Sequence, residues 1–230
     1  MPVGRTIPSI AGNTVGVGNM IVVVEPQNAG QHSGLLEDMF RLRARVFHDR
    51  LRWDVRVKDG MERDRYDDEA PVYILHTDDE TGELIGSLRL LPTTGPTLLA
   101  DFFADTAPDA AQLTSPFIWE CTRFCVDETK FGPGDRQALT FASASLVAAI
   151  GQVALDAGIE TILGNFDAPM LRLYRRIGCK VDVLGSTRRY GHSVYLGSFQ
   201  VSESILNHII ARLGEAHLGG RPAHRPPLAA

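Results

Sequence analysis

The chain has 230 residues, of which 44% are hydrophobic and 22% charged, and its formal net charge is −5. A chain of this length and ordinary composition is expected to form a globular protein with a well-buried core. The negative charge is not typical of a nucleic-acid-binding protein, so we expect no nucleic-acid partner. No apolar run approaches the roughly 18 residues of a membrane span, so we expect no membrane association.

The three cysteines, Cys121, Cys125 and Cys179, form an odd and sparse set. We interpret them as reduced thiols of a cytoplasmic protein, because a disulfide framework would need more cysteines. No Cys/His pair follows Cys121 and Cys125 at the spacing of a zinc site, so we predict no metal.

The two ends of the chain differ from its middle. Residues 1–19 contain one arginine, several glycines and no compact apolar block, unlike a secretory signal. We expect a disordered extension there, one domain over residues 20–213, and a flexible tail rich in Gly, Pro, His and Ala over 214–230.

Hydrophobic spacing predicts the elements in chain order. A strand is expected over 20–25, and apolar residues three and four apart predict a helix over 33–51. Gly158 and Gly178 are natural helix ends. The other predicted strands are 71–77, 83–91, 117–126, 159–166, 179–184 and 193–200, and the other helices are 136–157, 168–177 and 202–213. This order predicts an α/β fold in which helices cover one mixed sheet.

The first candidate cluster lies at the end of the helix predicted over 33–51. Arg43 and Phe47 share a helix face, Trp53 follows, and Asp64 and Asp67 lie in a polar loop. A cation, two aromatic rings and two carboxylates suit a ligand with an adenine ring, a sulfonium and an amino-acid group. A buried aromatic pair beside a solvated charged surface is the open alternative.

Charged residues also interrupt two apolar strands. Arg89 lies in one of them, and Glu120 and Arg123 lie in another. A buried charge must be paired or functional. Strand alternation puts Glu120 and Arg123 on opposite faces, so a shared pocket requires a β-bulge between them. A buried structural ion pair is the alternative.

Together these clusters resemble the acyl-homoserine-lactone synthases, the autoinducer synthases of the LuxI type. The family pattern has Arg, Phe and Trp early in the chain, then an Asp pair, an Arg before LPTTGP, and Glu and Arg within WE-x-x-RF. Order and spacing match over roughly residues 20–200. The resemblance implies a GNAT-like fold, with a mixed β-sheet sandwiched by helices, and a quorum-sensing acyltransferase.

In such enzymes the α-amine of S-adenosylmethionine attacks the thioester of an acylated acyl carrier protein, and lactonisation then releases methylthioadenosine. The resemblance implies that Glu120 is the general base. S-adenosylmethionine is a substrate, so no cofactor is expected. Asp64, Asp67 and Arg89 are expected to form a charge network near the site. The residues expected to bind S-adenosylmethionine are Arg43, Phe47, Trp53, Arg123 and Phe124.

The acyl pocket is expected between strand 159–166 and the helix over 136–157. Several relatives that favour 3-oxo chains carry a threonine where this chain has Phe166, whose ring cannot donate a hydrogen bond to an oxo group. Preference for 3-oxo chains is therefore not implied. The pocket residues expected are Ser143, Leu146, Val147, Gly164 and Phe166.

The acyl carrier protein is expected to dock on the basic residues Arg172, Arg176 and Lys180, because carrier proteins are acidic. A solvated basic surface is the alternative. Acyl-CoA is the less expected donor, because the relatives that use a CoA donor carry Tyr at the position of Phe47.

Two other functions stay open. An N-acetyltransferase that uses acetyl-CoA needs a glycine-rich pyrophosphate loop before a helix, and Gly132-Pro133-Gly134-Asp135-Arg136 is a short, poor match. A non-catalytic module would bind S-adenosylmethionine without releasing methylthioadenosine. The synthase assignment requires that Trp53 and Glu120 line one cavity.

Overall fold

A computed structural model describes residues 20–78, 80–107 and 110–219. A seven-stranded sheet has the order β1-β4-β5-β6-β7-β9-β8. All neighbours in it are antiparallel except β6 and β7, which run parallel. The strands are β1 (Met20–Val24), β4 (Val72–Thr77), β5 (Leu84–Pro92), β6 (Ile118–Val126), β7 (Thr161–Asp167), β8 (Asp182–Thr187) and β9 (Val194–Gln200).

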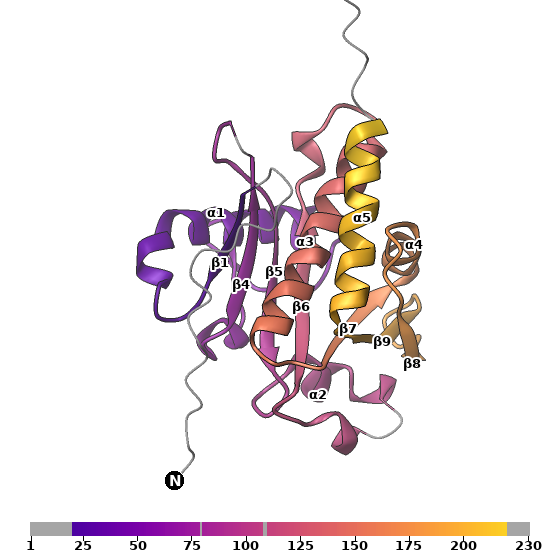
Figure 1. The fold of residues 1–230 in the computed structure, drawn as a ribbon. Helices are drawn as coiled ribbons and strands as arrows, with labels where there is room; N and C mark the ends of the chain where they lie inside the picture. The colour runs from indigo at the N-terminus through magenta and orange to yellow at the C-terminus, as the bar shows by residue number, and fades with distance from the viewer. Residues whose placement is uncertain (1–19, 79, 108–109, 220–230) are drawn as a thin grey trace, which may run out of the picture.

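Helices cover both faces of this sheet, as predicted (Figure 1). α3 (Arg136–Asp156) and α5 (Glu203–Gly219) pack side by side on one face, and α1 (Ser33–Arg43) packs on the other. The remaining helices are α2 (Leu98–Phe102) and α4 (Ala168–Arg176). Shorter helical segments are η1 (Ala29–His32), η2 (Ala44–Arg50), η3 (Arg65–Asp68), η4 (Ala104–Thr106), η5 (Ala110–Leu113) and η6 (Glu128–Lys130).

Strand alternation divides the core into two layers. On β4, Ile74 packs with the α3 side, whereas Tyr73 and Leu75 pack with the α1 side. Successive side chains of a strand point to opposite faces, so a fully buried strand such as β4 supports a helix on each side.

Helix α3 is long and apolar enough to cross a membrane by length and composition, which our sequence analysis did not anticipate. Over half of its apolar window is buried inside the fold, between the sheet and α5. Burial on several sides explains the composition, as in the core helix of a globular domain.

The sheet opens between its two parallel strands. β6 pairs with β7 only from Ile118 to Glu120, opposite Thr161 to Leu163. Beyond Glu120, β6 continues along β5 and β7 continues along β9. The β5–β6 register shifts where Ser87 pairs with Cys125 and Arg89 with Thr122, and Arg123 has a φ of 55°. This bulge bends β6 away from β7.

Most predicted elements are present within a few residues, but the first and last helices differ, and the structure adds the helix α2 and a hairpin. The helix expected over 33–51 widens at Ala44 into the π-helical η2. The last helix reaches Gly219, so the first residues of the expected tail are helical. A short hairpin, β2 (Val57–Lys58) and β3 (Met61–Glu62), was not predicted. The extension expected over 1–19 lies outside the described residues, as does the tail beyond 219.

Candidate active site

A cavity of about 970 Å³ lies where β6 and β7 separate. Residues from both faces of the sheet line it, because the opening joins the two sides. Trp53 and Glu120 both line this cavity, which meets the requirement set by the sequence analysis.

The aromatic pair is positioned by the π-helical segment η2. The backbone N–H of Leu51 donates to the Val46 carbonyl, and that of Trp53 donates to Phe47. This wide turn brings the two rings into a stack, with centroids 5.0 Å apart and planes 26° apart. Phe47 is buried, whereas Trp53 is 41% exposed and can still receive a ligand.

Glu120 lies at the point where the sheet opens. Its carboxylate accepts hydrogen bonds from the backbone N–H groups of Leu98 (2.9 Å) and Leu99 (2.6 Å), at the start of α2. Burial raises the pKa of Glu120 to about 7, although these N–H groups and the charges of Arg89 and Arg123 act in the opposite direction. A carboxylate with this pKa can accept a proton near neutral pH.

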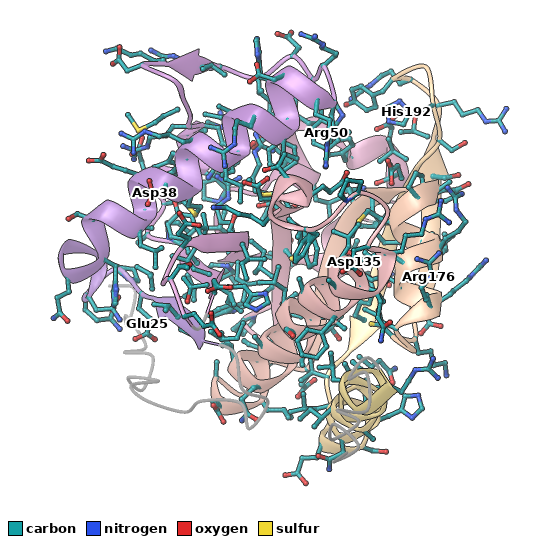
Figure 2. All side chains as sticks on the ribbon, turned by 90° about the horizontal axis from the view of Figure 1, so that it is seen from above. Glu25, Asp38, Arg50, Asp135, Arg176 and His192 are labelled. Carbon is teal, nitrogen blue, oxygen red and sulfur yellow. The ribbon has the colours of Figure 1, made fainter. Side chains whose placement is uncertain are left out.

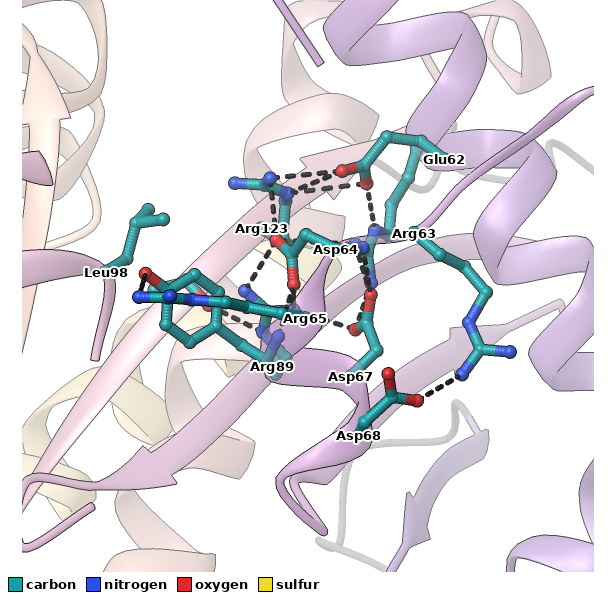
Figure 3. Close-up of polar contacts among 12 residues, drawn as sticks. Glu62, Arg63, Asp64, Arg65, Asp67, Asp68, Arg89, Leu98 and Arg123 are labelled. Atoms are coloured by element: carbon teal, nitrogen blue, oxygen red, sulfur yellow. Dashed lines mark hydrogen bonds and ion pairs between the residues drawn. The ribbon is translucent and has the colours of Figure 1, made fainter. Parts of the chain in front are cut away.

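A network of three arginines and three carboxylates joins the loop that carries Asp64 to the sheet (Figure 3), and two of its arginines, Arg89 and Arg123, act on the charge of Glu120. Arg43 donates to Glu62 (2.5 Å) and to both oxygens of Asp67. Arg89 donates to Asp64 (2.5 Å) and Asp67 (2.7 Å). Arg123 pairs with Glu62 and with Asp64 (2.7 Å). The network fixes the loop over 57–68 to α1, β5 and β6.

Pairing keeps the charges of this network in place. Burial alone would raise the pKa of Asp67, but Arg43 and Arg89 outweigh it and hold that pKa well below its ordinary value. Asp67 also accepts a hydrogen bond from Tyr73 and closes a capping box with Asp64 at η3. The charge network expected of Asp64, Asp67 and Arg89 is therefore present in the structure.

Arg43 does not line the cavity, contrary to the expected contact with a ligand. Its side chain is fully buried and its donors are directed to Glu62 and Asp67. Arg123 does line the cavity, with its guanidinium over the Phe47 ring at 5.4 Å. The predicted irregularity of β6 exists, but it falls at Arg123 itself rather than between Glu120 and Arg123.

The far half of the cavity is apolar and lies on the α3 side. Val147, Gly164 and Phe166 line it, as expected. Phe124 also lines it and packs against this apolar cluster, so its contact with S-adenosylmethionine stays a prediction. Ser143 and Leu146 do not line it: Ser143 donates to the Leu139 carbonyl, and Leu146 packs against Gly86.

Sequence reasoning missed two groups of the site. Glu62 is fully buried, ion-paired to Arg43 and Arg123, and lines the cavity. Its local sequence is a charge-rich loop, in which nothing distinguishes a buried acid from its exposed neighbours. The two N–H groups that bind Glu120 are backbone atoms and leave no sequence signal.

A second, smaller pocket of about 450 Å³ lies between α3, α4 and α5. Arg136, Arg176 and Arg212 line it together with apolar residues, and Ile209 lines both this pocket and the main cavity. Arg172 and Lys180 are exposed nearby on the chain, and Arg176 lies at the outer side of the molecule in Figure 2. Basic groups from three helices thus surround one apolar hollow.

Cys121, Cys125 and Cys179 are all free. Over the described residues, no group of three or more His, Cys, Asp or Glu side chains is placed to hold a metal ion. Burial raises the pKa of Cys121 to about 12, so its thiol is no nucleophile near neutral pH.

The fold and site define an acyltransferase with an N-acetyltransferase-like architecture. Solved structures share this fold. One is the acyl-homoserine-lactone synthase BjaI, which is described as CoA-dependent and was solved with S-adenosylmethionine and isopentyl-CoA. It has a TM-score of 0.73 and 28% identity, and the match covers 86% of this chain and 90% of that one. The synthase LasI has a TM-score of 0.72 and 26% identity, covering 84% and 95%. A putative N-acetyltransferase from Lactobacillus plantarum has a TM-score of 0.51 at 18% identity, which shows the fold alone.

The family model "Autoinducer synthase" matches residues 27–209. An acyl-homoserine-lactone synthase from Rhizobium etli is 43% identical over 167 residues, 72% of this chain and 77% of the relative. One from Agrobacterium fabrum is 33% identical, covering 76% and 82%. The chain belongs to the autoinducer synthase family and is an acyl-homoserine-lactone synthase, an acyltransferase of quorum sensing.

Proposed function

We propose that this enzyme acylates the α-amine of S-adenosylmethionine with an acyl group from an acyl carrier protein, then closes the lactone and releases methylthioadenosine. The observation that carries the proposal is the opening between β6 and β7. It joins a polar and aromatic half containing Trp53 and Glu120 to an apolar half containing Phe166.

The polar half suits S-adenosylmethionine. Trp53 offers an exposed ring to an adenine or a sulfonium, and an aromatic face attracts a cation by about 0.5–2 kcal/mol. Asp64 lines the same wall and is partly exposed, so it can meet the positive groups of the ligand. Arg43 then acts through the network, by holding Glu62 and Asp67, rather than by contact with the ligand.

Glu120 supplies the general base in this scheme. The α-ammonium of the substrate must lose a proton before its nitrogen can attack the thioester carbon, and a carboxylate with a pKa of about 7 can take that proton, directly or through a water. The N–C bond forms, the C–S bond breaks and a thiol leaves. In the second step the carboxylate of the methionine portion attacks its own γ-carbon, and a folded-back conformer accelerates this closure.

The apolar half suits an acyl chain. Phe166 packs against Tyr174 and Phe199, and these rings line the pocket with Val147. The Phe166 ring lies so close to Gly197 that a Cβ there would be 2.4 Å from it. Phe166 is therefore fixed in place, and it presents no hydrogen-bond donor to a 3-oxo group.

Two observations support a carrier protein over CoA as the donor. The N-terminus of α3, where a CoA pyrophosphate would be held, is occupied by its own cap: the Asp135 carboxylate accepts from the Ala138 N–H. The pocket between α3, α4 and α5 adds Arg136 and Arg212 to the expected docking residue Arg176, and this positive rim is complementary to an acidic carrier. The relative BjaI is described as CoA-dependent, so the donor needs a direct test.

The same proposal includes no cofactor, because both reactants supply the chemistry, and a cytoplasmic location, because the free thiols and the expected substrates fit that compartment.

The decisive experiment combines the purified chain and S-adenosylmethionine with acyl-carrier protein or with the matching acyl-CoA, over short, medium and long chains. Mass spectrometry then measures lactone and methylthioadenosine. We expect both products, with kcat/KM about tenfold or more higher for the carrier, and no turnover by Glu120→Gln despite retained ligand binding. Binding without methylthioadenosine would make the chain a non-catalytic module.

The variants Arg136→Glu and Arg176→Glu test the carrier assignment. We expect each to raise KM for the acyl-carrier protein while leaving the KM for S-adenosylmethionine unchanged, and added salt should raise the wild-type carrier KM. Equal use of acyl-CoA, or charge reversals without effect, would refute the carrier assignment and leave the synthase activity in place.

A further inference from the structure

The side-chain oxygen of Asn165 lies in the cavity wall and receives no hydrogen bond from the part of the chain that the structure describes. Asn165 lies on β7, two residues beyond Leu163, which is the last β7 residue that pairs with β6. It lines the main cavity, and its Oδ1 is buried without a hydrogen bond from any described residue. A buried carbonyl oxygen without a donor costs stability, so such an atom calls for an explanation.

Neighbouring groups fix the orientation of this amide. The Thr106 hydroxyl donates to the Phe103 carbonyl (2.6 Å), so its oxygen can only accept from the Asn165 side chain. Asn165 Nδ2 donates to that oxygen at 3.1 Å. A flipped amide would bring two acceptors together and leave an N–H group unpaired. Oδ1 therefore points away from Thr106.

The face of the sheet on which Asn165 lies determines which groups can reach its Oδ1. Residues two apart on a strand share a face, so Asn165 lies on the side of Leu163, which packs with Leu99 of α2. Glu120 lies on this side too, since it binds the N–H groups of Leu98 and Leu99. Phe166 and the apolar pocket lie on the other side. Asn165 thus flanks the opening on the side of the amine, not of the acyl chain.

We propose that Asn165 Oδ1 accepts a hydrogen bond from the α-amine of the amino-acid substrate and holds that nitrogen for attack on the thioester. This inference rests on the proposed function. The ammonium carries three N–H bonds and the product amide carries one. Two protons leave the nitrogen during acylation: Glu120 takes one, and the other ends on the sulfur as the N–C bond forms, the C–S bond breaks and the thiol departs. The third N–H is retained, and Asn165 can hold it throughout.

A neutral acceptor suits this task better than a carboxylate does. A second carboxylate beside the amine would favour the ammonium form and raise the pKa of the substrate's amine, which opposes attack. An amide oxygen directs the nitrogen without that effect. Its preorganised anchor on Thr106 keeps the direction constant as the reaction proceeds.

The test uses Asn165→Leu and Asn165→Asp, which have nearly the same size as the native residue. Thr106→Val is the control: it removes the anchor of the amide, together with the hydrogen bond to the Phe103 carbonyl, and leaves Asn165 in place. Steady-state kinetics with S-adenosylmethionine and an acyl-carrier protein that the wild type turns over give kcat and KM, and calorimetry gives binding of S-adenosylmethionine. An inactive wild type would refute the proposed function itself. An active wild type leaves that function in place, and the variants then test only the role of Asn165.

We expect Asn165→Leu to lower kcat by about tenfold or more, with KM and ligand binding changed less than about threefold. Asn165→Asp should retain turnover but shift the acid limb of the kcat profile, which reports groups in the bound complex, to higher pH by about one unit. Thr106→Val should lower kcat less than Asn165→Leu does. Wild-type kcat in Asn165→Leu, a loss confined to KM, or an unshifted profile in Asn165→Asp would overturn the assignment.

Discussion

Glu120, the proposed general base, is held in the fold at a cost in stability. Its carboxylate is almost fully buried and accepts two backbone N–H bonds, yet burial still raises its pKa to about 7. The folded state therefore disfavours the ionised form relative to the unfolded chain, in which the ordinary value is 4.5. The ionised form of Glu120, which the proposed mechanism uses as the base, is thus also the form that weakens the fold.

The first prediction follows from the sign of this shift. The contribution of Glu120 to stability is fully present below pH 4.5 and is lost as the pH rises through about 7. Glu120→Gln cannot ionise, so it does not suffer this loss. As the pH rises from 4.5 to 8, its free energy of unfolding should therefore increase by about 2–3 kcal/mol relative to that of the wild type. Urea unfolding at both pH values measures this gain, with the exposed Glu160→Gln as control. A constant difference between variant and wild type across that range would contradict the shift.

Arg43 illustrates the opposite case, a charge that supports the fold. Arg43→Ala leaves Glu62 and Asp67 with one arginine each, in a buried setting. We predict a loss of about 3 kcal/mol in the free energy of unfolding, because an uncompensated buried charge is costly. Arg41→Ala, two residues earlier and half exposed, should cost less than about 1 kcal/mol. Similar losses for both variants in urea denaturation would refute the role of the buried network.

At the scale of the elements, the sequence indicates where charges interrupt apolar strands but not what meets them. Arg89 and Glu120 stand out because each lies in an apolar strand, and both lie on the strands predicted for them, β5 and β6. Their partners come from segments without periodicity: Asp64 from a loop, and the N–H groups from the short helix α2. A pattern of residue types cannot show a backbone donor or the direction in which a loop turns.

The widening of the first helix has the same cause. Spacing correctly placed Arg43 and Phe47 within one helical segment. The turn from Ala44 onward is π-helical, because the Leu51 N–H bonds to Val46, five residues back, and not four. This wider turn stacks Trp53 on Phe47, and hydrophobic periodicity carries no information about which hydrogen bond a backbone N–H will choose.

We expect helix α3 to limit the depth of the proposed acyl pocket at Gly151. This residue lines the cavity, and a Cβ there would lie 3.3 Å from Leu206 Cδ1 of α5. We predict that Gly151→Val reduces kcat/KM for long acyl chains by about tenfold and leaves short chains within about twofold, because a hydrophobic pocket discriminates by roughly 1–3 kcal/mol per methylene. Competition between donors of different length, read by mass spectrometry, measures the shift. The smaller Gly151→Ala is the control, and equal losses for all lengths would exclude a role in chain length.

For the whole molecule, the predicted order of strands and helices was sufficient to expect a mixed sheet covered by helices, and the structure confirms it. The division of the cavity was not predictable in the same way. Ser143 and Leu146 lie on the expected helix but face the packed interior, whereas Val147 faces the cavity. Which face of α3 meets the opening depends on how the sheet splits after Glu120, and that split depends on the bulge at Arg123.

The same global arrangement makes the fold sensitive to acid. Asp67 joins α1 to β5 through Arg43 and Arg89, and its pKa is held well below the ordinary value of 3.8. Its stabilising contribution is present above pH 3.8 and is lost as the pH falls toward the folded-state pKa. Asp67→Asn should therefore cost about 3 kcal/mol at pH 7, and the difference from wild type should shrink steadily below pH 4. Asp68→Asn, whose side chain is 77% exposed, should follow the wild-type curve. Thermal unfolding from pH 7 to pH 2 measures the stability of the wild type and of both variants. Parallel stability curves for Asp67→Asn and the wild type would show that the charge of Asp67 does not link α1 to β5.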